Sequence, residues 1–109
     1  MSTSWAWFLL VLSGLVDVAW AIATKNAEGF RNPVWAGISL ALLAIFVMLL
    51  TRALAVLPLG VAYGVWVGIG ALGSLAAGTV FFGEPVTAAR AGFAALIIVG
   101  VIGLKVTTA

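Results

Sequence analysis

The chain lacks the residue types on which much protein chemistry depends. It has 109 residues with no cysteine and no histidine, and only 7% of its residues are charged. Without cysteine it forms no disulfide and uses no thiolate. Without histidine it lacks the commonest metal ligand and the usual proton carrier near neutral pH. We therefore expect no metal site and no cofactor.

Apolar residues take the place of the missing charge. Hydrophobic residues make up 65% of the chain, against five Lys or Arg and three Asp or Glu. Eight charged side chains cannot cover the surface of a small soluble domain, because small folds expose a large share of their residues. The composition predicts an integral membrane protein. The net charge of +2 is too small to indicate a nucleic-acid partner.

Charges and prolines divide the chain into four apolar segments. These cover about residues 4–24, 34–51, 59–82 and 88–106. A bilayer core of about 30 Å needs about 20 helical residues, so the first three segments are read as transmembrane helices. The fourth has a shorter uncharged core and can span if Arg90 and Lys105 extend from its ends to the interfaces; two or three spans are the alternatives to four. The first has no basic residue before it and is too long for a signal peptide, so we expect it to be retained. The prediction is an all-α, four-helix membrane bundle forming one domain over residues 1–109.

The basic residues give the chain little preference for one orientation. Four spans place Arg52 and Lys105 on the side of the N-terminus, and Lys25, Arg31 and Arg90 on the other. A three-to-two division is a weak signal under the positive-inside rule. Insertion in both orientations is therefore an open alternative to a fixed topology.

Asp17 is the only ionisable side chain between Met1 and Thr24. A carboxylate at bilayer depth is costly, and such residues usually mark a pathway for an ion or a proton. No Lys or Arg lies in the interior of a predicted helix to pair with it, and Lys25 is two turns away. We therefore expect Asp17 to bind a cation or a proton.

Aromatic and small residues share the predicted face of Asp17. Helical spacing places Ser13, Gly14 and Trp20 beside it. In the third segment Tyr63 and Trp66 are also three residues apart. A carboxylate surrounded by aromatic rings suits an organic cation, because each ring adds a cation–π contact. Ordinary packing or an interfacial aromatic belt is the alternative for the tryptophans.

A second subunit is expected, because four short helices are too few to enclose a solute pathway. Small residues follow two rows on the third segment, and such rows allow helices to approach closely in lipid. The rows comprise Gly60, Gly64, Gly68, Gly70, Ser74 and Gly78. In addition, Gly68 and Gly70 could mark a helix bend.

These residues favour a proton-coupled antiporter for small organic cations. Two Asp17 carboxylates in one dimeric chamber would titrate together and hold either protons or a cation. Two other functions stay open: a non-transporting or regulatory membrane subunit, and a passive cation channel. The sequence contains no nucleotide-binding loop or hydrolytic constellation, so we do not expect an enzyme. Glu28 and Glu84 are interpreted as loop and turn residues.

The chain resembles the small multidrug resistance transporters along its whole length. Residues 14–21 (GLVDVAWA), followed by Lys25, are similar to the acidic first-helix motif of that family. Residues 57–66 (LPLGVAYGVW), 68–70 (GIG) and 83–85 (GEP) resemble the third helix and the turn after it. The fourth-helix dimer contact is matched by residues 97–105 (IIVGVIGLK).

The resemblance implies a proton-coupled cation exporter in the bacterial plasma (inner) membrane. It implies an antiparallel dimer in which both first-helix acids share one pocket and Ile97, Gly100 and Val101 form part of the subunit contact. Trp20 resembles the guanidinium-exporter branch more than the quaternary-ammonium branch, which stays an alternative.

Two residues depart from the family pattern. Asp17 stands where the family has Glu, and Phe46 stands where the guanidinium branch has a serine near the acid. A homodimer and a heterodimer with a partner of the same family are both compatible with the sequence.

Overall fold

The computed structural model describes residues 2–107, which form four helices. The helices are α1 (Thr3–Asn26), α2 (Pro33–Leu54), α3 (Leu59–Phe82) and α4 (Ala88–Val106). The last two have the predicted bounds, and the first two extend slightly beyond theirs. Each helix is long and apolar enough to cross a membrane. The prediction of an all-α chain with four membrane-spanning helices is confirmed.

Short polar signals fix the helix ends. The hydroxyl of Ser2 accepts a hydrogen bond from the backbone N–H of Trp5 at 3.1 Å, and Thr87 caps α4 in the same way through Arg90. Asn32 caps α2, whose first residue is a proline. α3 ends at Gly83, whose φ of +66° is left-handed and therefore favours glycine. These caps explain why the helices begin and end close to the breaks in the apolar pattern.

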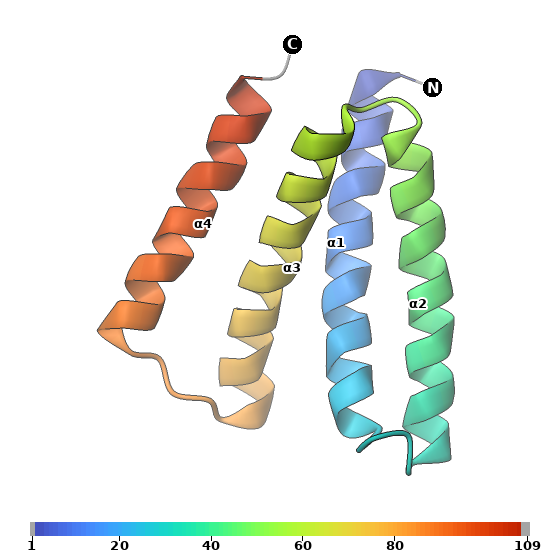
Figure 1. The fold of residues 1–109 in the computed structure, drawn as a ribbon. Coiled ribbons are helices and arrows are strands. Elements are labelled where there is room, and N and C mark those ends of the chain that lie inside the picture. The colour runs from blue at the N-terminus through green and yellow to red at the C-terminus, as the bar shows by residue number, and fades with distance from the viewer. Residues whose placement is uncertain (1, 108–109) are drawn as a thin grey trace.

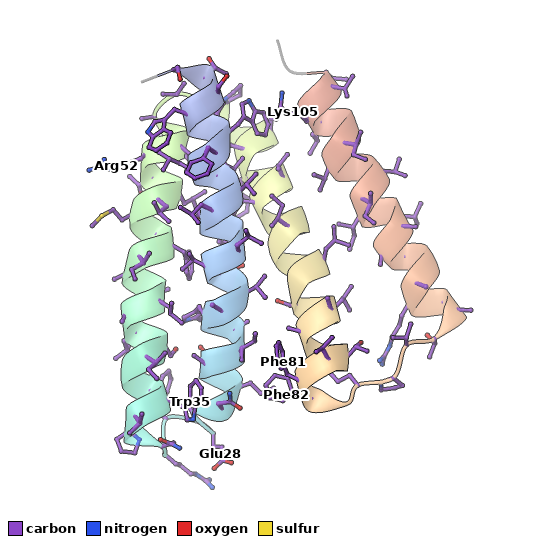
Figure 2. All side chains as sticks on the ribbon, turned by 180° about the vertical axis from the view of Figure 1, so that it is seen from behind. Glu28, Trp35, Arg52, Phe81, Phe82 and Lys105 are labelled. Atoms are coloured by element: carbon purple, nitrogen blue, oxygen red, sulfur yellow. The ribbon has the colours of Figure 1, made fainter. Side chains whose placement is uncertain are left out.

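The helices follow one another in the spatial order α2, α1, α3, α4 (Figure 1). The backbone of α1 lies close to both α2 and α3, whereas the backbone of α4 lies close to α3 alone among the described helices. Both ends of the chain lie at one end of the molecule (Figure 1). Arg52 and Lys105 lie at that end too, and Glu28 and Trp35 lie at the other (Figure 2). This arrangement agrees with the sides predicted from four spans and leaves a flank of α1 and α3 uncovered by the chain's own helices.

The buried core is formed by α1, α2 and α3, towards the end that holds the termini. Leu10 is fully buried there, and alanines such as Ala6, Ala53 and Ala62 have no exposed surface. Alanine allows helix backbones to approach closely, which drives helix association in lipid. α4 contributes no buried residue. The outer helix is therefore held by fewer contacts than the other three.

Among the glycines of α3, Gly68 is the one that α4 approaches most closely. A Cβ atom at Gly68 would overlap Cγ2 of Val101, while a Cβ at Gly37 of α2 would meet nothing within 4 Å. We predict that Gly68→Ala lowers the free energy of unfolding by about 1–3 kcal/mol, as overpacking does in other cores. Gly37→Ala should leave it unchanged or raise it by up to about 1 kcal/mol.

Reversible unfolding in mixed detergent micelles, followed by circular dichroism, measures both variants. Equal stability of the two would contradict the close contact between α3 and α4.

Candidate functional site

Asp17 lies in the contact between α1 and α3. It is partly buried, and its carboxylate reaches the backbone of α3 at Gly70. A Cβ atom at Gly70 would overlap Oδ2 of Asp17, so the missing side chain of this glycine makes room for the acid. Among residues 2–107 the carboxylate makes no hydrogen bond and no ion pair. Both oxygens are therefore free to accept bonds from a bound cation.

Four aromatic side chains form a continuous row across three helices. The ring centroids of Trp20 and Phe46 are 5.7 Å apart, those of Phe46 and Trp66 5.6 Å, and those of Trp66 and Tyr63 5.5 Å. Trp20 comes from α1 one turn beyond Asp17, Phe46 from α2, and the other two from α3. The structure thus brings together the aromatic residues that the sequence suggested. Phe46 is almost fully buried in the middle of the row.

Ser13 and Gly14 hold α1 against its two neighbours. Ser13 is fully buried, and its hydroxyl donates a hydrogen bond of 2.8 Å to the carbonyl oxygen of Phe46 on α2. A Cβ atom at Gly14 would lie 2.7 Å from the side chain of Ile69 on α3. The Ser13 hydroxyl therefore bonds within the fold, and the close approach at Gly14 sets the spacing of α1 and α3 one turn from Asp17.

A second polar bond between α1 and α2 is not predicted from the sequence. The hydroxyls of Thr24 and Ser39 are 2.7 Å apart, and Ser39 is buried. An isolated serine inside an apolar segment was the available signal, since a buried hydroxyl needs a partner. Its partner lies on another helix and is not visible from local spacing.

Lys25 pairs with Glu84 and not with Asp17. Its Nζ atom lies 3.6 Å from Oε2 of Glu84 and 5.1 Å from the ring centroid of Phe82. The sequence predicts Glu84 as a turn residue, and its side chain is about half exposed. Their pairing could have been found from topology, because the ends of α1 and α3 that carry these residues lie on one side of the membrane.

A cavity of about 490 Å³ lies between α1 and α3 on the side of this ion pair. It begins one helical turn from Asp17 and Gly70, at Ala21 and Ser74, and ends at Lys25 and Glu84. Its lining comprises Ala21, Ile22, Lys25, Ala71, Ser74, Leu75, Ala77, Gly78, Phe82 and Glu84. The cavity thus extends along α1 and α3 from Lys25 and Glu84 towards the level of Asp17.

The expected dimer-contact residues divide into two groups. Ile97 and Val101 lie against Gly68 of the same chain, whereas a Cβ at Gly100 would meet nothing within 4 Å. α3 continues as one helix through Gly68 and Gly70. These two glycines face α4 and Asp17 respectively, so each has a packing role within the chain.

Four membrane-spanning helices and one carboxylate beside an aromatic row define a multi-pass membrane protein with a candidate cation site. The family model described as Small Multidrug Resistance protein matches residues 5–99. The chain belongs to this family.

Relatives within the family align with nearly the whole chain. The guanidinium exporter of Yersinia pseudotuberculosis is 44% identical over 103 residues, which are 94% of this chain and 99% of the relative. The guanidinium exporter of Escherichia coli K12 is 40% identical over 94% of this chain and 98% of its own length. That of Citrobacter freundii is 39% identical with the same coverage.

The interhelical bond of Ser13 gives a prediction about stability. Ser13→Ala should lower the free energy of unfolding by about 0.5–1.5 kcal/mol, because a buried hydrogen bond between α1 and α2 is lost. Thr51→Ala is the matched control, since its exposed hydroxyl bonds to Val47 of its own helix at 2.7 Å. It should change the stability less than Ser13→Ala in the same micelle unfolding measurement. A larger effect at Thr51 would contradict a structural role for the Ser13 hydroxyl.

Proposed function

We propose that this protein exports small organic cations of the guanidinium type in exchange for protons, with Asp17 as the shared binding site. The observation that carries the proposal is the Asp17 carboxylate at Gly70, which has no partner among residues 2–107 and lies one helical turn from a cavity that extends to Lys25 and Glu84. The guanidinium exporters that align with almost the whole chain support the substrate class.

Competition between a proton and an organic cation for the Asp17 carboxylate would couple proton flux to cation flux. An ionised Asp17 attracts a cation, and a protonated Asp17 does not. A planar guanidinium can donate two hydrogen bonds to a carboxylate and stack on an aromatic face. Trp20 and Trp66 supply such faces, and Tyr63 adds a hydroxyl to the row. Binding of the cation thus requires loss of the proton, which is the exchange that an antiporter needs.

The cavity between α1 and α3 supplies one half of an access path. It approaches Asp17 from the end that carries Lys25 and Glu84. Alternating access needs a matching opening from the other side of the membrane. An antiparallel dimer supplies it, because its second subunit presents the same cavity in the opposite direction. A bend of α3 at Gly68 and Gly70 would change which side is open.

We propose the dimer as the working unit in the bacterial inner membrane. α4 has no buried residue, and Gly100 leaves space on its surface for a close neighbour. Gly100 would then lie in the contact region, and Ile97 and Val101, which also pack against Gly68 of their own chain, would border it. In the dimer two Asp17 carboxylates share one chamber and titrate as a coupled pair. A partner of the same family with Glu at this position would form an equivalent heterodimer.

Phe46 favours a second candidate, the export of bulkier cations such as quaternary ammoniums. Its ring packs between Trp20 and Trp66 and gives this side of the site an apolar aromatic wall. Such a wall contacts the alkyl groups of a quaternary ammonium as well as a guanidinium plane. Transport of tetraalkylammonium in preference to guanidinium would select this candidate.

Asp17→Asn tests the central residue. Asparagine keeps the shape but neither ionises nor carries a proton. In proteoliposomes that are acidic inside, we expect the wild type to take up guanidinium. The uptake rate of Asp17→Asn should be lower by a factor of at least about ten, because a hydrogen bond to a charged group contributes about 1.5–3 kcal/mol.

Asp17→Glu is the matched control. It restores the acid of the family pattern, and we expect it to keep proton-driven uptake. Equal uptake by the wild type and Asp17→Asn would rule out Asp17 as the coupling site.

Gly70→Ala tests the position of the carboxylate without removing it. The added methyl group would displace Oδ2 of Asp17, whereas a Cβ at Gly60 of the same helix meets nothing within 4 Å. We predict a weaker affinity for guanidinium in Gly70→Ala and an unchanged affinity in Gly60→Ala, measured by isothermal titration calorimetry. The same affinity in both variants would show that the approach of Asp17 to Gly70 does not matter for binding.

A further inference from the structure

The ammonium group of Lys25 lies at one end of the cavity between α1 and α3, beside Phe82 and Glu84. Its Nζ atom is 3.6 Å from the Glu84 carboxylate and 5.1 Å from the centre of the Phe82 ring. All three residues line the cavity. Phe82 occupies the last turn of α3, at the same end of the molecule as Glu28 (Figure 2). A cation thus contacts one carboxylate and one aromatic ring at this place.

The Glu84 carboxylate and the Phe82 ring together have the chemistry of an organic-cation site. A carboxylate supplies charge and hydrogen-bond acceptors, and a ring face attracts the same cation through its quadrupole. Asp17 and its neighbouring aromatic row offer the same combination of carboxylate and ring nearer the middle of the helices. Glu84 and Phe82 therefore provide a second carboxylate and a second aromatic ring for an organic cation, at the end of α3.

The backbone holds Glu84 in place without help from Lys25. Its N–H donates a 3.0 Å hydrogen bond to the carbonyl oxygen of Gly78, across the left-handed turn at Gly83. Its side chain folds back onto α3, where a Cβ atom at Gly78 would overlap Oε1 of Glu84. The acceptor is thus fixed by α3 itself, and Lys25 approaches it from α1.

We propose that Phe82 and Glu84 form a second, peripheral binding site for small organic cations, which Lys25 occupies in this structure as a tethered cation. The Lys25 and Glu84 side chains are both about half exposed, and ion pairs of that kind are weak. An incoming guanidinium can therefore displace the lysine and then pass along the cavity towards Asp17. The inference rests on the proposed function only for the class of ligand.

The opposite end of the molecule provides a matched control. Lys105 lies 4.8 Å from the ring centre of Trp7, but no carboxylate among residues 2–107 pairs with it. Removing Lys105 would expose a ring without an anion. Removing Lys25 would expose a ring together with an anion. A site that needs both a ring and a carboxylate should bind guanidinium more tightly after removal of Lys25 and not after removal of Lys105.

The test uses the full-length chain carrying Asp17→Asn, so that the central site cannot contribute. Guanidinium chloride is titrated into the protein in lipid bicelles, and the amide resonances of Phe82, Gly83 and Glu84 are followed by NMR, with sodium chloride in a parallel titration. Adding Lys25→Met should lower the dissociation constant of guanidinium at these resonances by roughly fivefold, as expected for competition with an exposed ion pair. Adding Lys105→Met should not change it.

Glu84→Gln and Phe82→Leu, each added to the Lys25→Met protein, should abolish the saturable response. Either variant alone suffices if the other does not fold. Equal shifts with sodium chloride, no gain from Lys25→Met, or a response that survives loss of the carboxylate would each overturn the proposal. Because Asp17 is absent throughout, these outcomes leave the proposed function untouched. Conversely, failure of transport at Asp17 would not alter binding at Glu84.

Discussion

The close approach of α1 and α3 at Asp17 and Gly70 is the contact on which the candidate site depends. Asp17 is partly buried, and its carboxylate needs space where it meets the backbone of α3; the missing side chain of Gly70 supplies that space. The turns on either side follow the same rule, since Gly14 faces Ile69 and Gly73 faces Val18. Small residues therefore place the acid directly against the backbone of the neighbouring helix.

The same contact connects the acid to its surroundings. α1 lies between α2 and α3, so residues of both neighbours can reach the level of Asp17. On the α2 side Ser13 bonds to the Phe46 carbonyl, and Phe46 joins the tryptophans into one row. On the α3 side a cavity begins one helical turn from Asp17 and extends towards Lys25 and Glu84. Trp20 of this row and the near end of the cavity each lie one helical turn from Asp17, the residue proposed to bind the cation.

The helices and the central acid could be predicted from the sequence because their signals are local. Proline, charge and apolar length bound each span, and Asp17 stands alone in its segment. The pairing of Lys25 with Glu84 could not be found by periodicity, since the two residues lie on different helices and far apart in the chain. The partners of Ser13 and Thr24 were hidden for the same reason. Local patterns predict faces, whereas packing decides which helix each face meets.

Proton release on cation binding tests the central claim most directly. Purified wild-type protein in weakly buffered detergent solution is mixed with guanidinium chloride, and the pH is followed with an indicator dye. If one carboxylate binds either a proton or the cation, guanidinium should release protons saturably from the wild type and release none from Asp17→Asn. Binding of guanidinium to the wild type without proton release, or equal release from both proteins, would contradict a shared site at Asp17.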